Sequence, residues 1–128
     1  MKFQPDNLPG TNVITRQEPD RIWVGNEGGN VAYASSVLVP WQGPVQGWLE
    51  GGFDALDAAA FDRIAALAPE VVVFGSGSRL RFAHPSLMRG LLERRIGVET
   101  MDTAAACRTF NVLAAEGRQV LAALLLAA

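Results

Sequence analysis

The stretch from Gly97 to Gly117 most constrains the fold, because it contains a strand end, a helix start, a whole helix and a helix stop within 21 residues. Asp102 is a good N-cap, since its carboxylate can accept the free N–H groups of a first helical turn. Gly117 supplies the left-handed backbone position at which helices commonly end. We therefore expect a helix over residues 103–116.

One side of this helix is predicted to be buried. Ala106, Phe110 and Leu113 recur at i, i+4 and i+7, the spacing of one helical face. Arg108 and Asn111 lie three residues apart on the same helix. Two interpretations of Arg108 remain open. It is either exposed opposite the apolar stripe or turned into a cleft, where a buried guanidinium would need a partner.

Strand patterns dominate the first third of the chain and alternate with helix patterns afterwards. We expect a hairpin over residues 13–24, one long strand from Val31 ending at Pro40, a buried strand over 71–74 and a short strand over 98–101. Leu and Ala favour helix over residues 120–126, whereas the preceding Gly117 stop favours a strand. Helix spacing predicts helices over 53–68, capped by Asp54 or Asp57, and over 86–95, with Pro85 at its first position.

This alternation predicts an α/β fold, a single-domain layered sandwich with a mixed β-sheet, an N-terminal hairpin region and about three helices. The length of 128 residues fits one domain. Residues 1–10 carry no periodicity and are interpreted as a flexible N-terminal arm, so the domain is expected over 11–128.

Gly75-Ser76-Gly77 follows the buried strand and has two interpretations. It is a tight turn, or an anion or small-molecule site in which backbone N–H groups contact the ligand with the help of Arg79 or Arg81. A third glycine at dinucleotide spacing and a Gly-Lys-Ser ending are both missing, which weakens the second interpretation.

No catalytic set can be assembled from the reactive side chains. Cys107 flanks an apolar stripe and is expected to be a small buried hydrophobe. His84 precedes Pro85 and is expected near the start of the next helix. Asp102 is explained by capping, and Glu99 has no aligned partner. We expect neither a catalytic residue nor a metal site nor a cofactor.

Two tryptophans lie in a glycine-rich loop over 41–52. Trp41 and Trp48 are costly to leave in water, so each must dock on something. Either they cover the edge of the core, or they form a partner surface, since Trp is enriched at binding hot spots.

Charge and composition limit the partners. The net charge of −2 gives no global attraction to nucleic acid, although residues 79–118 hold seven Arg against four acids, 7 − 4 = +3. The single Cys fits a reducing compartment, and the longest apolar run is too short to span a bilayer. We expect a cytoplasmic chain without membrane insertion.

A family resemblance rests on several of these motifs. Glu99-Thr-Met-Asp-Thr103, Ala106-Cys-Arg-Thr-Phe-Asn-Val-Leu113 and Glu116-Gly-Arg118, together with Val72-Val-Phe-Gly-Ser-Gly77, Phe82 and Ser36-Val-Leu-Val-Pro40, resemble the signature of the domain of unknown function 498 family. The resemblance implies an α/β fold, with a strand rather than a helix over residues 120–126. It also implies an interaction or assembly role, because a mitochondrial member is an assembly factor for respiratory complex I. Another protein is therefore the expected partner. The alternative is a domain that binds a small molecule or anion, and that could be an enzyme, through the Gly75–Gly77 loop and Arg residues.

Overall fold

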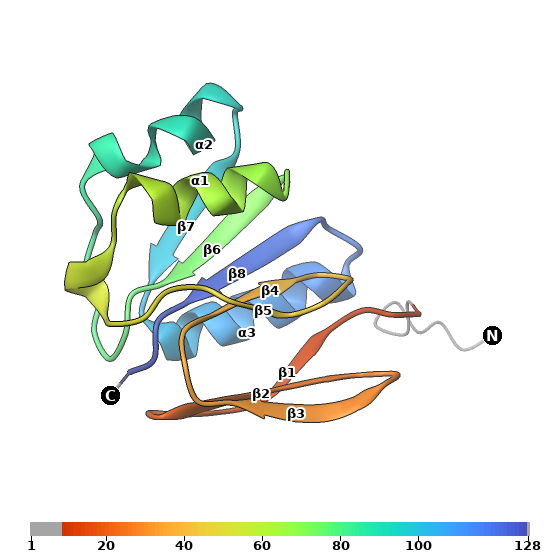
Figure 1. Ribbon diagram of the computed structural model, residues 1–128. Coiled ribbons are helices and arrows are strands. Elements are labelled where there is room, and N and C mark those ends of the chain that lie inside the picture. The colour runs from red at the N-terminus through yellow and green to blue at the C-terminus, as the bar shows by residue number, and fades with distance from the viewer. Residues whose placement is uncertain (1–8, 128) are drawn as a thin grey trace.

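The computed structural model describes residues 9–127 and contains two β-sheets and three α-helices (Figure 1). The strands are β1 (Val13–Glu18), β2 (Arg21–Asn26), β3 (Gly29–Tyr33), β4 (Val37–Pro40), β5 (Gln46–Gly47), β6 (Val71–Gly75), β7 (Gly97–Met101) and β8 (Val120–Leu124). The helices are α1 (Ala58–Ala66), α2 (Arg89–Glu93) and α3 (Thr103–Ala115), with 3₁₀ turns η1 (Phe53–Ala55) and η2 (Pro85–Met88).

The five-stranded sheet has the order β5-β4-β8-β6-β7. β6 pairs in parallel with both β7 and β8, and β4 is antiparallel to β8. All five residues of β6 are buried, as expected for a strand covered on both faces. The predicted mixed sheet and α/β fold are confirmed.

Side chains of β6 alternate between two cores. Val72 and Phe74 pack with Phe61 of α1 and Leu91 of α2, whereas Val73 packs with Phe110 of α3. Figure 1 shows α1 and α2 on one face of the sheet and α3 on the other. The three-stranded sheet, of order β1-β2-β3, lies against α3 and closes the second core.

The caps of α3 agree with the sequence. Asp102 accepts the Ala105 N–H at 2.8 Å, and Gly117 adopts φ 82° just beyond the helix. Ala106 and Phe110 are fully buried and Leu113 is half-buried, so the predicted stripe faces the core. The helix stops at Ala115, one residue before the predicted end.

The other two predicted helices are shorter and each is preceded by a 3₁₀ turn. The helix expected over 53–68 is interrupted because Leu56 is extended and Asp57, one of the two proposed caps, accepts the Ala60 N–H at 2.9 Å and starts α1. The helix expected over 86–95 begins as η2, with Pro85 at its start, and becomes α-helical only from Arg89.

The long strand expected from Val31 to Pro40 is wrong. The chain leaves the outer sheet after Tyr33, crosses over residues 34–36, and enters the central sheet at Val37. Residues 37–39 are buried on both faces of the sheet, whereas residues 29–32 are exposed. The alternating pattern therefore joined two strands with different surroundings.

Most of the predicted N-terminal arm, residues 1–8, lies outside the described residues. Within residues 9–127, the structure holds no helix that is long and apolar enough to cross a membrane.

Candidate functional site

The strand register gathers several loops at one edge of the five-stranded sheet. Gly75 pairs with both Met101 and Leu124, Leu124 pairs with Val37, and Val37 pairs with Gly47. These five residues form one row at the carboxyl ends of β6, β7 and β8. The segments that leave this row are 34–36, 48–52, 76–84, 102–103 and 125–127. Ligand sites of open α/β sheets occur at this kind of edge.

The Gly75-Ser76-Gly77 turn is closed around its own hydrogen bonds. The Ser76 N–H donates to the Met101 carbonyl at 2.9 Å, and the Gly77 N–H donates to the Thr103 hydroxyl at 2.9 Å. A Cβ on Gly75 would come within 3.0 Å of the Thr103 Cα, so this glycine allows α3 to approach the strand. The Ser76 and Gly77 N–H groups, which an anion would need as donors, are therefore already bonded within the chain. This geometry favours the tight-turn interpretation.

The residues after this turn form an outward-facing loop, Ser78–Phe82, which we call the Phe82 loop. Its base is braced by Ser76: the hydroxyl donates to the Arg79 carbonyl at 2.7 Å and accepts the Arg81 N–H at 3.1 Å. Arg81 also donates to the Ser76 carbonyl at 3.2 Å, and its guanidinium lies 4.3 Å from the centre of the Phe53 ring.

The braced loop presents apolar side chains to solvent. Phe82 is 71% exposed and Leu80 is 52% exposed. Arg79 is exposed between them and the turn. Neither Arg79 nor Arg81 has a carboxylate within ion-pair distance in the part of the chain that the structure describes.

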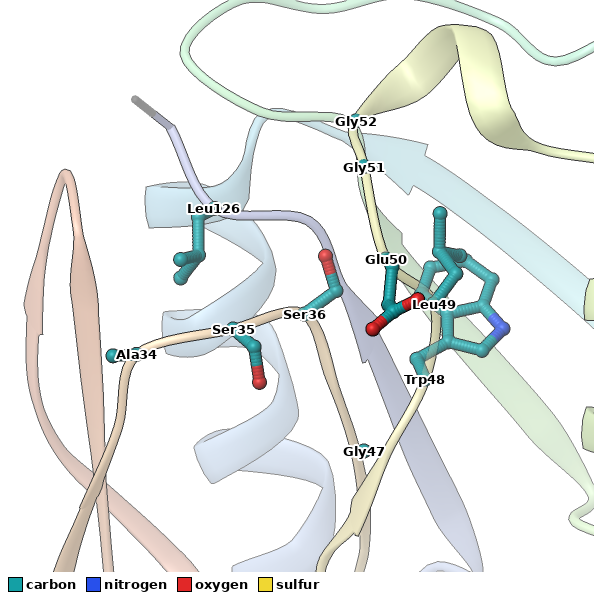
Figure 2. Close-up of a pocket in the computed structure, with 10 residues that line it drawn as sticks. All are labelled: Ala34, Ser35, Ser36, Gly47, Trp48, Leu49, Glu50, Gly51, Gly52 and Leu126. Carbon is teal, nitrogen blue, oxygen red and sulfur yellow. The ribbon is translucent and has the colours of Figure 1, made fainter.

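A hollow of about 690 Å³ lies at the same edge (Figure 2). One wall is the 34–36 segment, the other is the 47–52 segment, and Leu126 lies beyond the end of β8. Figure 2 shows the Glu50 carboxylate and the Ser36 hydroxyl on facing walls, while the Trp48 indole is turned away. Sequence reasoning missed this hollow, because it depends on register between distant segments.

Arg108 and Asn111 do not join the Gly75–Gly77 turn. They border a separate hollow of about 210 Å³ between α3 and β1, whose lining does not include Gly77. Arg108 is exposed, as in the simpler of the two interpretations. The Asn111 side chain accepts the Ile14 N–H and donates to the Ile14 carbonyl, both at 2.8 Å, and so ties α3 to β1.

The two reactive side chains have structural surroundings. Burial raises the pKa of the Cys107 thiol to about 12, with Arg108 acting weakly in the opposite direction. This thiol stays protonated near neutral pH and is a poor nucleophile. His84 caps η2, where its Nδ1 accepts the Ser86 N–H at 3.1 Å. Among residues 9–127, no three His, Cys, Asp or Glu side chains are grouped as a metal site would require.

The burial of Trp48 agrees with the interpretation in which this side chain covers the edge of the core. Trp48 is only 5% exposed, its indole N–H donates to the Ala60 carbonyl at 3.0 Å, and its ring makes edge contacts with Phe61 and Phe74. Trp41 is half-buried against the other core, at the opposite edge of the sheet. Both side chains dock on the domain, so neither supplies a free aromatic anchor at the carboxyl edge.

The expected basic segment is also divided. Arg118 pairs with Glu70 at 3.3 Å at the amino edge, and Arg94 donates to the Ala65 carbonyl at the end of α1 at 2.8 Å. Arg79 and Arg81 lie at the carboxyl edge, away from Arg94 and Arg118. The Arg residues of segment 79–118 therefore do not form one basic patch.

Comparison with known proteins identifies the family. A profile described as "Protein of unknown function (DUF498/DUF598)" matches residues 14–125. The chain belongs to this family. The match covers all of β4 to β8 and α3, whose ends form the carboxyl edge.

Relatives of this DUF498/DUF598 chain include an assembly factor. The mouse protein named NADH dehydrogenase [ubiquinone] 1 alpha subcomplex assembly factor 3 is 38% identical over 99 residues, which cover 76% of this chain and 52% of the relative. The chain thus spans about half the length of the curated relatives it matches.

Two solved structures have the same fold. A crystal structure from Bordetella parapertussis has a TM-score of 0.81 and 37% identity, and covers 91% of this chain and 96% of that one. A solution structure from Bordetella pertussis, described as an Mth938-like domain, has a TM-score of 0.81 and 30% identity, and covers 99% and 93%.

Proposed function

We propose that this chain is a non-catalytic protein-interaction module that assists the assembly of a multi-subunit complex, with a respiratory complex as the first candidate. The names of the curated relatives support the assembly role. The free, buried Cys107 suits the reducing environment of the cytoplasm, which we propose as the compartment.

The observation that carries this proposal is the exposure of Phe82 on a braced loop. The Ser76 and Arg81 hydrogen bonds fix this loop at its base, with Phe82 left exposed. A loop ordered before binding loses less conformational entropy when it meets a partner. Aromatic and Arg side chains are also the residue types enriched at hot spots.

The charges of the Phe82 loop indicate which side chains a partner surface would carry. Arg79 and Arg81 have no carboxylate partner among residues 9–127, and they flank the exposed Leu80. A complementary protein surface would place Asp or Glu side chains beside an apolar recess. Arg79 in particular can pair with a carboxylate through two parallel hydrogen bonds.

Purification of the tagged full-length chain from its native cells tests the proposal. We expect subunits of one complex to copurify with the unaltered chain, and expect Phe82→Ser and Arg79→Glu each to reduce their recovery about ten-fold or more. Val112→Ser is the matched control, because Val112 is 58% exposed but lies on α3. All three variants should unfold at nearly the same temperature.

The possible outcomes distinguish an error in the proposed assembly role from an error in the proposed contact surface. If the unaltered chain retains no more complex subunits than an unrelated tagged protein does, the assembly role is wrong. If the subunits are retained and both loop variants match Val112→Ser, the role stands and the Phe82 loop is not the contact.

A further inference from the structure

Among the described residues that line the hollow of Figure 2, Glu50 is the one charged residue, and it is exposed to solvent. Within residues 9–127, Glu50 has no cation at ion-pair distance. The nearby Arg63 instead donates to the Trp48 carbonyl and, at 2.8 Å, to the Gly47 carbonyl. The negative charge of Glu50 is therefore not neutralised by the described part of the chain.

A second polar group faces Glu50 across the hollow. Ser36 is only 6% exposed, yet its hydroxyl makes no hydrogen bond to another described residue. Figure 2 shows this hydroxyl pointing into the hollow. Arg81 Nε is the one buried side-chain polar atom without a partner among residues 9–127, so the Ser36 hydroxyl is open to solvent through the hollow, where a ligand can hydrogen-bond to it.

The remaining lining leaves room for an apolar ligand body. Gly47 and Gly52 carry no side chain, and a Cβ added at either would meet no atom within 4 Å. Ala34, Leu49 and Leu126 supply apolar surface around this space. The volume of about 690 Å³ falls within the range of about 300–1,000 Å³ typical of small-ligand sites.

We infer that this hollow binds a guanidinium or ammonium group carried on a short aliphatic stem. The Glu50 carboxylate accepts hydrogen bonds from the cation, Ser36 accepts one of its remaining N–H groups, and the stem covers the apolar wall. A guanidinium fits best, because its planar fork can donate two hydrogen bonds to one carboxylate and still present further donors. An anion is disfavoured by the charge of Glu50.

Such a cation has two sources, a free small molecule or an Arg or Lys side chain of a bound protein. The site does not depend on the Phe82 loop, so it can be tested separately from the proposed function. The probes are n-butylguanidinium, its neutral analogue n-butylurea, and a capped Gly-Arg-Gly peptide. Each is titrated into the ¹⁵N-labelled full-length chain, and backbone amide shifts are recorded.

We expect n-butylguanidinium to give saturable shifts at the amides of Gly47, Gly51, Gly52 and Leu126, and n-butylurea to bind about ten-fold more weakly or not at all. Peptide binding at least as tight as that of n-butylguanidinium assigns the site to a protein side chain. Exclusion of the peptide, with n-butylguanidinium still bound, assigns it to a free small cation.

Substitutions at Glu50 and Gly52 test whether the cation binds in this hollow. Glu50→Gln should weaken n-butylguanidinium about ten-fold or more, whereas Glu27→Gln, which removes an exposed carboxylate from the turn between β2 and β3, should leave affinity within about two-fold. Gly52→Leu should fill the space and abolish binding. The inference is overturned if the shifts are not localised to the hollow, if n-butylurea binds equally, or if Glu50→Gln behaves like Glu27→Gln.

Discussion

Replacement of Thr103 by Val tests how the carboxyl edge is held together. Thr103 is fully buried, and its hydroxyl accepts the Gly77 N–H at 2.9 Å while donating to the Leu125 carbonyl at 2.6 Å. One side chain thus joins the start of α3, the Gly75–Gly77 turn and the segment after β8. Valine has nearly the same shape but no hydroxyl.

The expected cost follows from the two groups left without a partner. A buried backbone group that loses its hydrogen bond costs about 1–3 kcal/mol. Two such groups, Gly77 N–H and Leu125 C=O, predict a loss of about 2–6 kcal/mol in the free energy of unfolding. This is a large share of the stability of about 5–15 kcal/mol usual for a domain.

Urea unfolding of the two proteins measures this loss, with Thr109→Val as the matched control on the same helix. The Thr109 hydroxyl contacts only the Met101 sulfur, at 3.3 Å, and the residue is half-buried. We expect this control to cost about 0.5 kcal/mol or less. Hydrogen exchange at the Gly77 amide should also accelerate in Thr103→Val alone. Equal costs for the two variants would refute the reasoning.

Three further predictions concern single side chains. Trp48→Ala should destabilise the chain by about 3–5 kcal/mol in denaturant melts, because the indole is a core side chain; a cost below about 1 kcal/mol would show that it is not. Arg95 adopts a left-handed φ of 59° after α2, so Arg95→Gly should raise stability by about 0.5–1 kcal/mol, whereas any loss would mean that its side chain makes an unseen contact. Cys107 should resist maleimide at pH 7.5 and react in denaturant. Burial raises the pKa of this thiol from the ordinary value of 9.0 to about 12, so its contribution to stability is complete below pH 9 and is lost as the pH rises toward 12. Cys107→Ala has no thiol to ionise and should not show this loss of stability.

Local signals in the sequence predicted much of the fold. The Asp102 cap, the Gly117 stop and the apolar run of β6 each act through neighbouring residues, and each was confirmed. The α/β class followed from their order along the chain.

The errors arose where the outcome depends on distant contacts. Alternating small and apolar residues over 31–39 fit one long strand, but pairing of β3 with β2 and of β4 with β8 divides it. For Trp48 the sequence left core cover and a partner surface both open, because its burial depends on Phe61 and Phe74 from other elements.

The candidate site shows the same limit. The Gly75–Gly77 turn was visible in the sequence, yet its hydrogen bonds to Thr103 and Met101 were not. The hollow beside Glu50 exists only because β4, β5 and β8 align at one edge.

Photo-cross-linking from position 82 tests the interaction surface most directly. The full-length chain carries p-benzoylphenylalanine in place of Phe82, or in place of Leu92, which is 60% exposed on the far side of α2. After irradiation of native cells, position 82 should yield one dominant adduct with a subunit of a multi-subunit complex, through a peptide with Asp or Glu beside apolar residues. Equal yields from both positions, or adducts only with lipid or a second copy of the chain, would contradict the proposed surface.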